Sequence, residues 1–153
     1  MSVSVQVLRG FEEGDFPALA DLWVAVWRES GFAIDFEARR PWLAGRLAGH
    51  RASGGAIVVG LDGEGRPAGG VTIDPASGYL DQICVAPAER GSGLARILLD
   101  EAKRLSPDGI ELDVNEANER ARRFYAREGF VFVTMGASAQ SGLPTLRLRW
   151  ARS

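Results

Sequence analysis

The sequence has very few of the residues that form disulfides or bind metals. Its 153 residues include one cysteine, Cys84, and one histidine, His50. A single cysteine cannot form a disulfide within the chain, and a protein metal site normally needs three or four Cys, His or carboxylate ligands. We therefore expect neither a disulfide framework nor a metal site.

The sequence also lacks long apolar runs, an export signal and an excess of positive charge. No apolar run approaches the length of about eighteen residues that suggests a membrane-spanning helix. The N-terminal stretch MSVSVQVLRGFEEGD has no basic segment followed by an apolar one. The formal net charge of -2 argues against a surface for duplex nucleic acid, which needs a surplus of Lys and Arg. We expect a soluble cytoplasmic protein that binds neither membrane nor nucleic acid.

What is present indicates one globular α/β domain over residues 1–153. Apolar residues make up 46% and charged residues 25% of the chain, which are ordinary globular values. Alternating valines from Val3 predict a first strand, and two helical patterns follow, the first after a candidate N-cap at Asp15 and the second ending near Gly49. Three strands are predicted next, over 56–61, 68–73 and 79–85, and a helix follows over 94–105. A strand over 110–115, a helix over about 118–129 and two strands beyond 130 complete the chain. This order is typical of an α/β or α+β domain around one mixed sheet.

The stretch ERGSGLA, residues 89–95, joins a predicted strand to a predicted helix. Gly91 and Gly93 allow a sharp turn and a close approach to the main chain, while a helix N-terminus offers unpaired N–H groups and partial positive charge. This combination favours an anion such as a diphosphate. The stretch lacks the Gly-Lys-Ser/Thr of a P-loop and the third glycine of a dinucleotide site. A plain strand-to-helix turn stays open as the alternative.

Two longer segments resemble a known family. ICVAPAERGSGLARILLDEAKRL is similar to the V-x-P-x-x-R/Q-G-x-G-x-G/A motif of the GNAT (GCN5-related N-acetyltransferase) family, with Arg90, Gly93 and Ala95 at its core positions. LDVNEANERARRFYAREGFV resembles the strand-then-helix ending of that family, with Asn118 and Ala121 at the customary spacing. Together the two motifs span residues 79–131.

The resemblance implies a fold and a ligand. The fold is a mixed, mostly antiparallel sheet of about seven strands flanked by about four helices, which splays apart between the fourth and fifth strands and takes acetyl-coenzyme A into the opening. In this chain, the segment Ile83, Cys84 and Val85 would pair its backbone with the pantetheine amides. The other residues that the resemblance assigns to the coenzyme are Arg90, Gly91, Ser92, Gly93, Leu94, Ala95, Asn118, Ala121 and Tyr125.

The resemblance also assigns catalytic roles. Acetyl transfer to an amine needs a neutral amine, a stabiliser for the oxyanion and an acid for the leaving thiolate. Asp81 is the candidate base, because strand alternation would place it on the face of Ile83 and Val85. That Asp81 only orients a cationic substrate stays open, and Tyr79 is a second candidate base. The Val85 N–H is expected to meet the oxyanion.

Tyr125 matches the usual general acid of the family, and core packing is its alternative role. Asn118 would bond the pantetheine arm, cap the helix, or do both. Cys84 alternates away from Ile83 and is expected to be a buried structural thiol, and His50 a helix-end residue rather than a base.

The acceptor side is expected in the first two helices and their connection. Candidate substrate-binding residues are Trp27, Phe32, Phe36, Tyr79 and Asp81, with core packing as the alternative for Trp23 and Trp27. Asp35 and Glu37 are further candidates to meet an amine.

The sequence thus predicts an N-acetyltransferase in which an amine attacks acetyl-coenzyme A directly. The expected partner is a small-molecule or peptide amine, and a homodimer is compatible with the resemblance. Two alternatives stay open, a non-catalytic acyl-coenzyme A sensor on the same fold and an enzyme that binds nucleotide phosphates.

Overall fold

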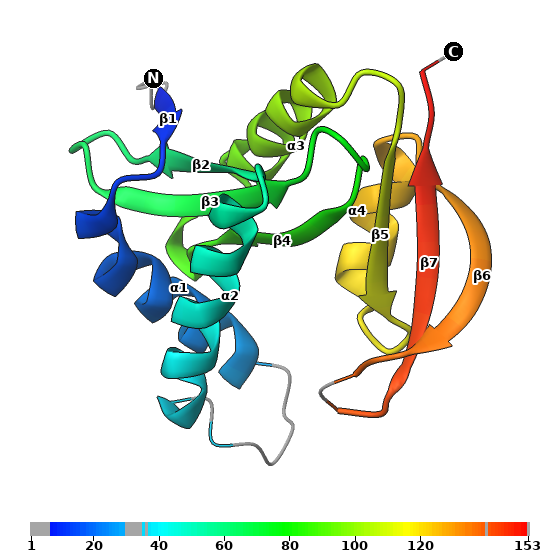
Figure 1. Cartoon of the computed structure of the whole chain (residues 1–153), viewed down its shortest axis with the longest axis horizontal. Coiled ribbons are helices and arrows are strands. Elements are labelled where there is room, and N and C mark those ends of the chain that lie inside the picture. Colours follow the sequence, from blue (N-terminus) through cyan, green and yellow to red (C-terminus); the bar gives the residue numbers. More distant parts are fainter. Residues whose placement is uncertain (1–6, 30–34, 36, 140, 153) are drawn as a thin grey trace.

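A computed structural model describes residues 7–29, 35, 37–139 and 141–152, so the predicted strand residues Val3 and Val5 lie outside it. Its elements follow one another in the predicted order (Figure 1). They are β1 (Val7–Gly10), α1 (Phe16–Arg28), α2 (Arg40–Ala52), β2 (Ala56–Leu61), β3 (Pro67–Ile73), β4 (Leu80–Val85), α3 (Leu94–Leu105), β5 (Ile110–Asn115), α4 (Glu119–Arg127), β6 (Val131–Ala137) and β7 (Pro144–Trp150). The predicted order and number of strands and helices are confirmed.

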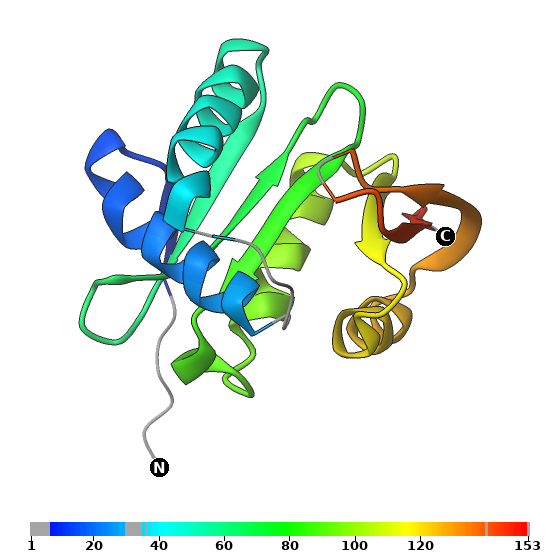
Figure 2. The same ribbon diagram turned by 90° about the horizontal axis from the view of Figure 1, so that it is seen from below.

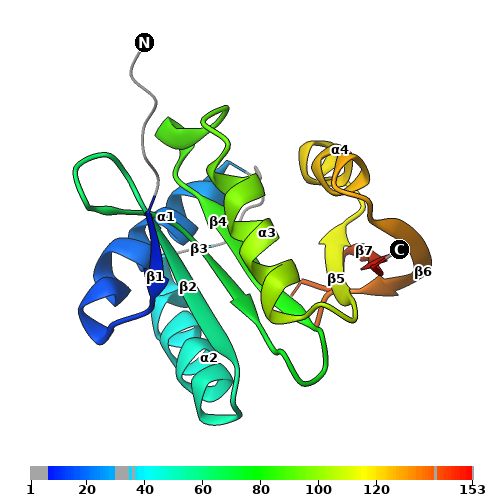
Figure 3. The same ribbon diagram turned by 90° about the horizontal axis from the view of Figure 1, so that it is seen from above.

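The strands form two groups rather than one continuous sheet. The first group has the order β1-β2-β3-β4 and the second the order β5-β7-β6, and neighbouring strands within each group are antiparallel. In the described part of the chain, the groups are joined by a single parallel bridge, between Tyr79 and Glu111. Beyond that bridge β4 and β5 diverge, which confirms the predicted splay (Figure 3).

Helices cover both faces of the first sheet (Figures 2 and 3). One face packs on α1 and α2 through a cluster that includes Leu19, Trp23 and Leu43, each no more than 1% exposed. The other face packs on α3, whose Leu94, Leu98 and Leu99 recur at helical spacing and are fully buried. This second cluster continues into β5, β7 and α4, so it holds the two sheets together despite their single bridge.

Two helix ends differ from the sequence-based expectation. Asp15 occupies the N-cap position of α1, but its carboxylate binds Arg9 at 2.6 and 2.7 Å and the Glu12 N–H at 2.8 Å instead of the helix. The second helix runs past Gly49 to Ala52, since Gly49 keeps helical geometry and the chain first turns left-handed at Gly54 (φ +93°). No helix among the described residues is long and apolar enough to cross a bilayer.

Candidate functional site

The open edge of β4 is the first feature of the site. The Ala86 N–H donates to the Ala68 carbonyl at 2.8 Å, toward β3. Because alternate residues of a strand direct their backbone groups to the same side, Cys84 also points its groups toward β3, whereas Ile83 and Val85 point theirs toward the opening. Two of the three predicted pantetheine-binding residues, Ile83 and Val85, therefore present backbone groups beside the splay that pair with no strand among the described residues.

The loop between β4 and α3 continues this edge. Gly91 (φ +81°) and Gly93 (φ +91°) are both left-handed, a conformation that strains other residues, and Gly93 is the N-cap of α3. Within the described chain, the N–H groups of Gly91, Gly93 and Ala95 make no hydrogen bond, while that of Leu94 is bonded to the Ser92 hydroxyl at 3.3 Å. Three backbone donors therefore gather at the positive end of a twelve-residue helix.

Arg90 lies in the same loop, and its side chain is already paired. Its guanidinium forms a two-point contact with Glu29 at the C-terminal end of α1, with Nη1 donating to Oε2 at 3.0 Å. The hydrogen bond from Arg90 lowers the pKa of the Glu29 carboxyl. The sequence could not indicate this pair, because its members are 61 positions apart.

Tyr125 is buried on α4, with only 6% of its surface exposed. Its ring packs between Phe124 and Phe130, each with ring centroids 5.4 Å away. The described residues provide no hydrogen-bond partner for its hydroxyl. Burial raises the pKa of the phenol, so the hydroxyl keeps its proton at neutral pH. Tyr125 belongs to the apolar cluster against which Ile83 and Val85 also pack.

Asn118 caps α4. Its side-chain oxygen accepts a hydrogen bond from the Ala121 N–H at 3.2 Å, so the capping role considered for this residue is present. Asn118 is exposed and Ala121 is partly buried against the cluster of Tyr125. The cap fixes where the helix begins, and thereby the turn on which Tyr125 lies.

Asp81 does not lie where strand alternation predicted. A β-bulge occurs here, because Thr72 is opposite Gln82 while Ile73 is opposite Leu80, which leaves Asp81 as the extra residue. As a result Leu80 and Ile83 pack on the same cluster, and the carboxylate of Asp81 instead reaches Arg46 of α2. The expectation that Asp81 shares the face of Ile83 and Val85 is therefore wrong, since one inserted residue breaks the period of two.

Arg46 holds both oxygens of Asp81, at 2.8 Å from Nε and 2.6 Å from Nη2. The guanidinium also lies over the ring of Trp42, 5.5 Å from its centroid. An incoming ammonium group would therefore reach Asp81 by replacing a guanidinium. Sequence reasoning missed Arg46, whose single position in α2 carries no motif.

An open groove of about 500 Å³ adjoins this pair, between α2 and the start of β4. Arg46, His50, Asp74, Tyr79 and Asp81 contribute to its lining. His50 is a helix-end residue, as expected, and one ring nitrogen lies 2.9 Å from the Ala56 carbonyl oxygen. The groove brings together two predicted substrate-binding residues, Asp81 on β4 and Tyr79 directly before that strand.

Tyr79 links this groove to the second sheet. Its hydroxyl donates to Asp113 on β5 at 2.9 Å, and Arg147 on β7 donates to the same carboxylate at 2.8 and 2.9 Å. Burial and the bond to Asp113 raise the pKa of the Tyr79 phenol, which keeps it protonated at neutral pH and disfavours it as a base. Arg147 also lies over the Tyr79 ring, at 5.5 Å.

The predicted aromatic substrate-binding residues of the first two helices and their connection are described only in part, because Phe32 and Phe36 lie outside the described residues. Trp27 is half-buried and packs on Trp42, with centroids 6.2 Å apart. Trp23 is a core residue, 1% exposed, and its indole N–H donates to Gln82 at 3.0 Å.

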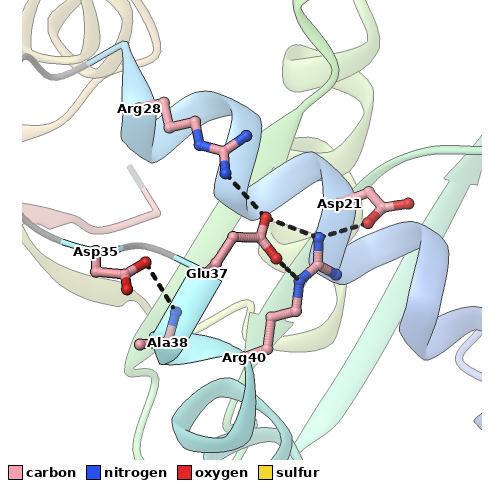
Figure 4. Close-up of polar contacts among 6 residues, drawn as sticks. All are labelled: Asp21, Arg28, Asp35, Glu37, Ala38 and Arg40. Carbon is pink, nitrogen blue, oxygen red and sulfur yellow. Dashed lines mark hydrogen bonds and ion pairs between the residues drawn. The ribbon is translucent and has the colours of Figure 1, made fainter.

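The two acidic candidates before α2 are already engaged (Figure 4). Glu37 accepts from Arg28 at 3.0 Å and from Arg40 at 2.7 Å, and the bond from Arg40 lowers the pKa of its carboxyl. Arg40 also binds Asp21 at 2.7 Å, and Asp35 accepts the Ala38 N–H at 3.2 Å. These contacts fasten the end of the α1–α2 connection to α1.

Cys84 turns its side chain away from the opening. It is 5% exposed and packs in the cluster of α1 and α2, and burial raises the pKa of its thiol to about 12. Its backbone groups point toward β3, so the predicted pairing of Cys84 with the pantetheine amides does not fit this geometry. In the described ranges, no three His, Cys, Asp or Glu side chains gather as metal ligands would.

Comparison with known proteins identifies the family. The profile of the Acetyltransferase (GNAT) family matches residues 16–130. Over 52 residues the chain is 36% identical to the peptidyl-lysine N-acetyltransferase YjaB of Escherichia coli (strain K12) and equally to that of Salmonella typhimurium, and each match spans 34% of this chain and 35% of the relative. The matched segment is thus about a third of the length of these relatives.

Solved structures share the fold over nearly the whole chain. The solution structure of apo YjaB from Escherichia coli has a TM-score of 0.77 at 21% identity, covering 97% of this chain and 99% of that one. A GNAT structure from Rhodopseudomonas palustris has a TM-score of 0.79 at 19% identity, covering 99% and 98%. With a family profile matched over well more than half of its length, the chain belongs to the GNAT family of acetyltransferases.

Proposed function

We propose that this acetyltransferase moves the acetyl group of acetyl-coenzyme A to a primary amine in a ternary complex. The observation that carries the proposal is a row with two sets of backbone groups that have no hydrogen-bond partner among the described residues. The first set belongs to Ile83 and Val85 on the open edge of β4, and the second is the N–H groups of Gly91, Gly93 and Ala95 at the start of α3. A chain of amides that ends in a pyrophosphate is a ligand that fits such a row.

The two ends of the row suit different parts of the coenzyme. The backbone groups of Ile83 and Val85 would pair with the pantetheine amides as a neighbouring strand does. The N–H groups around Gly91 and Gly93 would hold the pyrophosphate, since a helix start supplies partial positive charge and left-handed glycines let the ligand approach the main chain.

The reaction then needs three steps from this chain. The ammonium form of the acceptor loses a proton to Asp81 or through water, and its nitrogen attacks the thioester carbonyl carbon. The Val85 N–H would stabilise the oxyanion, whose collapse breaks the C–S bond. Tyr125 would then protonate the thiolate and regain a proton from the nitrogen through solvent. The same apolar surroundings that raise the pKa of Tyr125 would raise that of the leaving thiol, which keeps the transfer matched.

We assign the acceptor to the groove beside Arg46, Tyr79 and Asp81. The carboxylates of Asp74 and Asp81 line it, and that of Asp113 binds Tyr79, so the groove suits a cationic amine. The relatives named peptidyl-lysine N-acetyltransferase support a lysine side chain within a peptide as the first acceptor to test. Binding of the ammonium would replace the Arg46 guanidinium at Asp81.

Titration calorimetry with a matched pair of variants tests the coenzyme site. Gly93 (φ +91°) and Gly65 (φ +80°) are both left-handed, and neither has an atom within 4 Å of an added Cβ. Gly93→Glu and Gly65→Glu should therefore pay a similar backbone cost of about 1–2 kcal/mol. Only Gly93→Glu should weaken acetyl-coenzyme A binding, by at least about 100-fold, because its carboxylate repels the pyrophosphate and covers the donors.

The same titrations include ATP and NAD⁺ as competing phosphate ligands. We expect the wild-type protein to prefer acetyl-coenzyme A to both, because only the coenzyme has a pantetheine arm, whose two secondary amides can pair with the β4 edge. Equal affinity for ATP, or wild-type coenzyme affinity in a folded Gly93→Glu variant, would remove the basis of the proposed site.

A further inference from the structure

Arg46 and Asp81 form a two-point ion pair in the groove between α2 and the start of β4. The two hydrogen bonds, 2.8 and 2.6 Å long, join one side of the planar guanidinium to both carboxylate oxygens. The side chain of Asp81 is only 12% exposed, whereas that of Arg46 is 41% exposed. The guanidinium is thus the more exposed partner, and it covers a carboxylate that has little contact with solvent.

Trp42 gives the guanidinium a second anchor. Arg46 and Trp42 are four positions apart on α2, so their side chains lie on the same face of the helix. The guanidinium carbon is 5.5 Å from the centroid of the Trp42 ring, within the range of a cation–π attraction. Because this contact does not involve Asp81, Arg46 stays beside the groove when Asp81 takes another partner.

The other charges of the groove leave Arg46 as its fixed cation. Among the described residues that line the groove, Arg46 is the one arginine or lysine. The Asp74 carboxylate is bound within its own turn, by the Ala76 N–H and the Ser77 hydroxyl at 3.0 Å each. An ammonium group that displaces Arg46 from Asp81 would therefore satisfy the carboxylate and leave the guanidinium without its anion.

We infer that the acceptor of this groove carries a carboxylate beside its amine, and that Arg46 binds this carboxylate while Asp81 receives the ammonium. The inference rests on the proposed function, because it requires the acceptor to bind in this groove. Exchanging the Arg46–Asp81 pair for the two charges of the acceptor keeps every charge paired. Arginine suits this role, since its planar fork binds a carboxylate through two hydrogen bonds. With each new contact about 2.8 Å long, the two charged groups of the acceptor lie within roughly 6 Å of one another.

Two kinds of acceptor have this chemistry, a free α-amino acid and a peptide in which an acidic residue flanks a lysine. The test compares each carboxylate acceptor with its carboxamide: glycine, leucine and lysine with their amides, and a glutamate-flanked lysine peptide with its glutamine analogue. Thiol release from acetyl-coenzyme A gives kcat and KM for each acceptor. The wild-type kcat/KM should be at least about tenfold higher for the carboxylate member, either among the amino acids or in the peptide pair, which identifies the source.

Arg46→Gln and Arg51→Gln are matched variants, because both arginines lie on α2 and Arg51 is an exposed residue that does not line the groove. Arg46→Gln should raise KM about tenfold or more for the carboxylate acceptor. The same variant should lower KM for the carboxamide, because the guanidinium no longer competes with the ammonium for Asp81. A purely structural role of Arg46 would impair both acceptors alike. Arg51→Gln should keep the wild-type preference, and both variants should bind acetyl-coenzyme A with wild-type affinity.

The outcomes separate this inference from the proposed function. Equal kcat/KM for the two members of every pair overturns the inference, and so does a preference for carboxylates that Arg46→Gln retains. Cadaverine, which is lysine without its carboxylate, is the reference amine. Transfer to cadaverine alone overturns the inference but leaves acetyl transfer to a primary amine in place. Absence of transfer to every one of these amines contradicts the proposed function, and the inference fails with it.

Discussion

Replacing Tyr125 by phenylalanine removes one hydroxyl and keeps the ring that packs between Phe124 and Phe130. In the free protein the described residues give this hydroxyl no hydrogen-bond partner. We therefore expect Tyr125→Phe to change the free energy of unfolding by less than about 0.5 kcal/mol. As the general acid, the same hydroxyl should be worth about 10²- to 10⁴-fold in kcat, or roughly 2.7–5.4 kcal/mol of barrier.

The assay measures thiol release with a saturating amine, together with a single-turnover experiment that isolates the chemical step. Tyr125→Ala is the comparison variant, because removing a ring that is only 6% exposed should cost about 3–5 kcal/mol of stability. Stability and catalysis thus separate in Tyr125→Phe and fall together in Tyr125→Ala. Wild-type single-turnover rates in Tyr125→Phe would refute the acid role and point to solvent as the proton source.

Three further substitutions test contacts that surround the site. Glu29→Gln frees Arg90 from its ion pair, so calorimetry should record about two- to fivefold tighter acetyl-coenzyme A binding at low salt. This gain in affinity should shrink as added salt screens the phosphates. Weaker binding would instead mean that the Glu29–Arg90 pair holds the loop in its active form. Asp81→Asn should lower kcat by about 10²- to 10⁴-fold if Asp81 is the base. If Asp81 only orients the amine, the variant should raise KM and leave kcat unchanged. Unaltered kinetics would exclude both roles. Asp15→Asn should lower the free energy of unfolding, measured by chemical denaturation at pH 7, by about 1–3 kcal/mol. The reason is that hydrogen bonding to Arg9 lowers the pKa of the Asp15 carboxyl, whose side chain is only 7% exposed. Since the pKa of Asp15 is lowered, its stabilisation is complete above the unfolded pKa of about 3.9 and is lost as pH falls through the folded value. The free energies of unfolding of the wild type and Asp15→Asn should therefore converge in acid. A difference that stays constant with pH would contradict the stabilising role of the Asp15 carboxylate.

The sequence predicted the parts of the site that depend on local patterns. Glycines at 91 and 93 indicated a tight turn at a helix start, and both are left-handed. Alternation placed Cys84 away from Ile83, and its thiol packs under α1 and α2. Such features depend on a few neighbouring residues, whose periodicity and turn chemistry can be read directly.

Other parts of the site depend on contacts between distant segments. The bulge at Asp81 shifts the pairing register of β4 with β3 by one residue. The alternation of apolar and polar residues in the sequence does not reveal such an inserted residue. Arg46 and Glu29 find their partners only when α2 and α1 pack against β4 and the loop. The exposure of all seven β6 residues was equally hidden, because a run of apolar residues is typical of a buried strand and the sequence does not say which strand ends the sheet.

The most direct test of direct acetyl transfer follows the acetyl group by mass spectrometry, in the intact protein and in a lysine-containing peptide. The chain suits this measurement, because its one lysine, Lys103, donates to the Glu128 carbonyl at 2.8 Å and its one cysteine is buried. Direct transfer predicts that acetyl-coenzyme A alone leaves the protein unmodified. Adding a competent amine should then give acetylated amine and free coenzyme A in equal amounts. An acetylated protein that passes its acetyl group to the amine, or coenzyme binding without transfer to any primary amine in a broad panel, would contradict it.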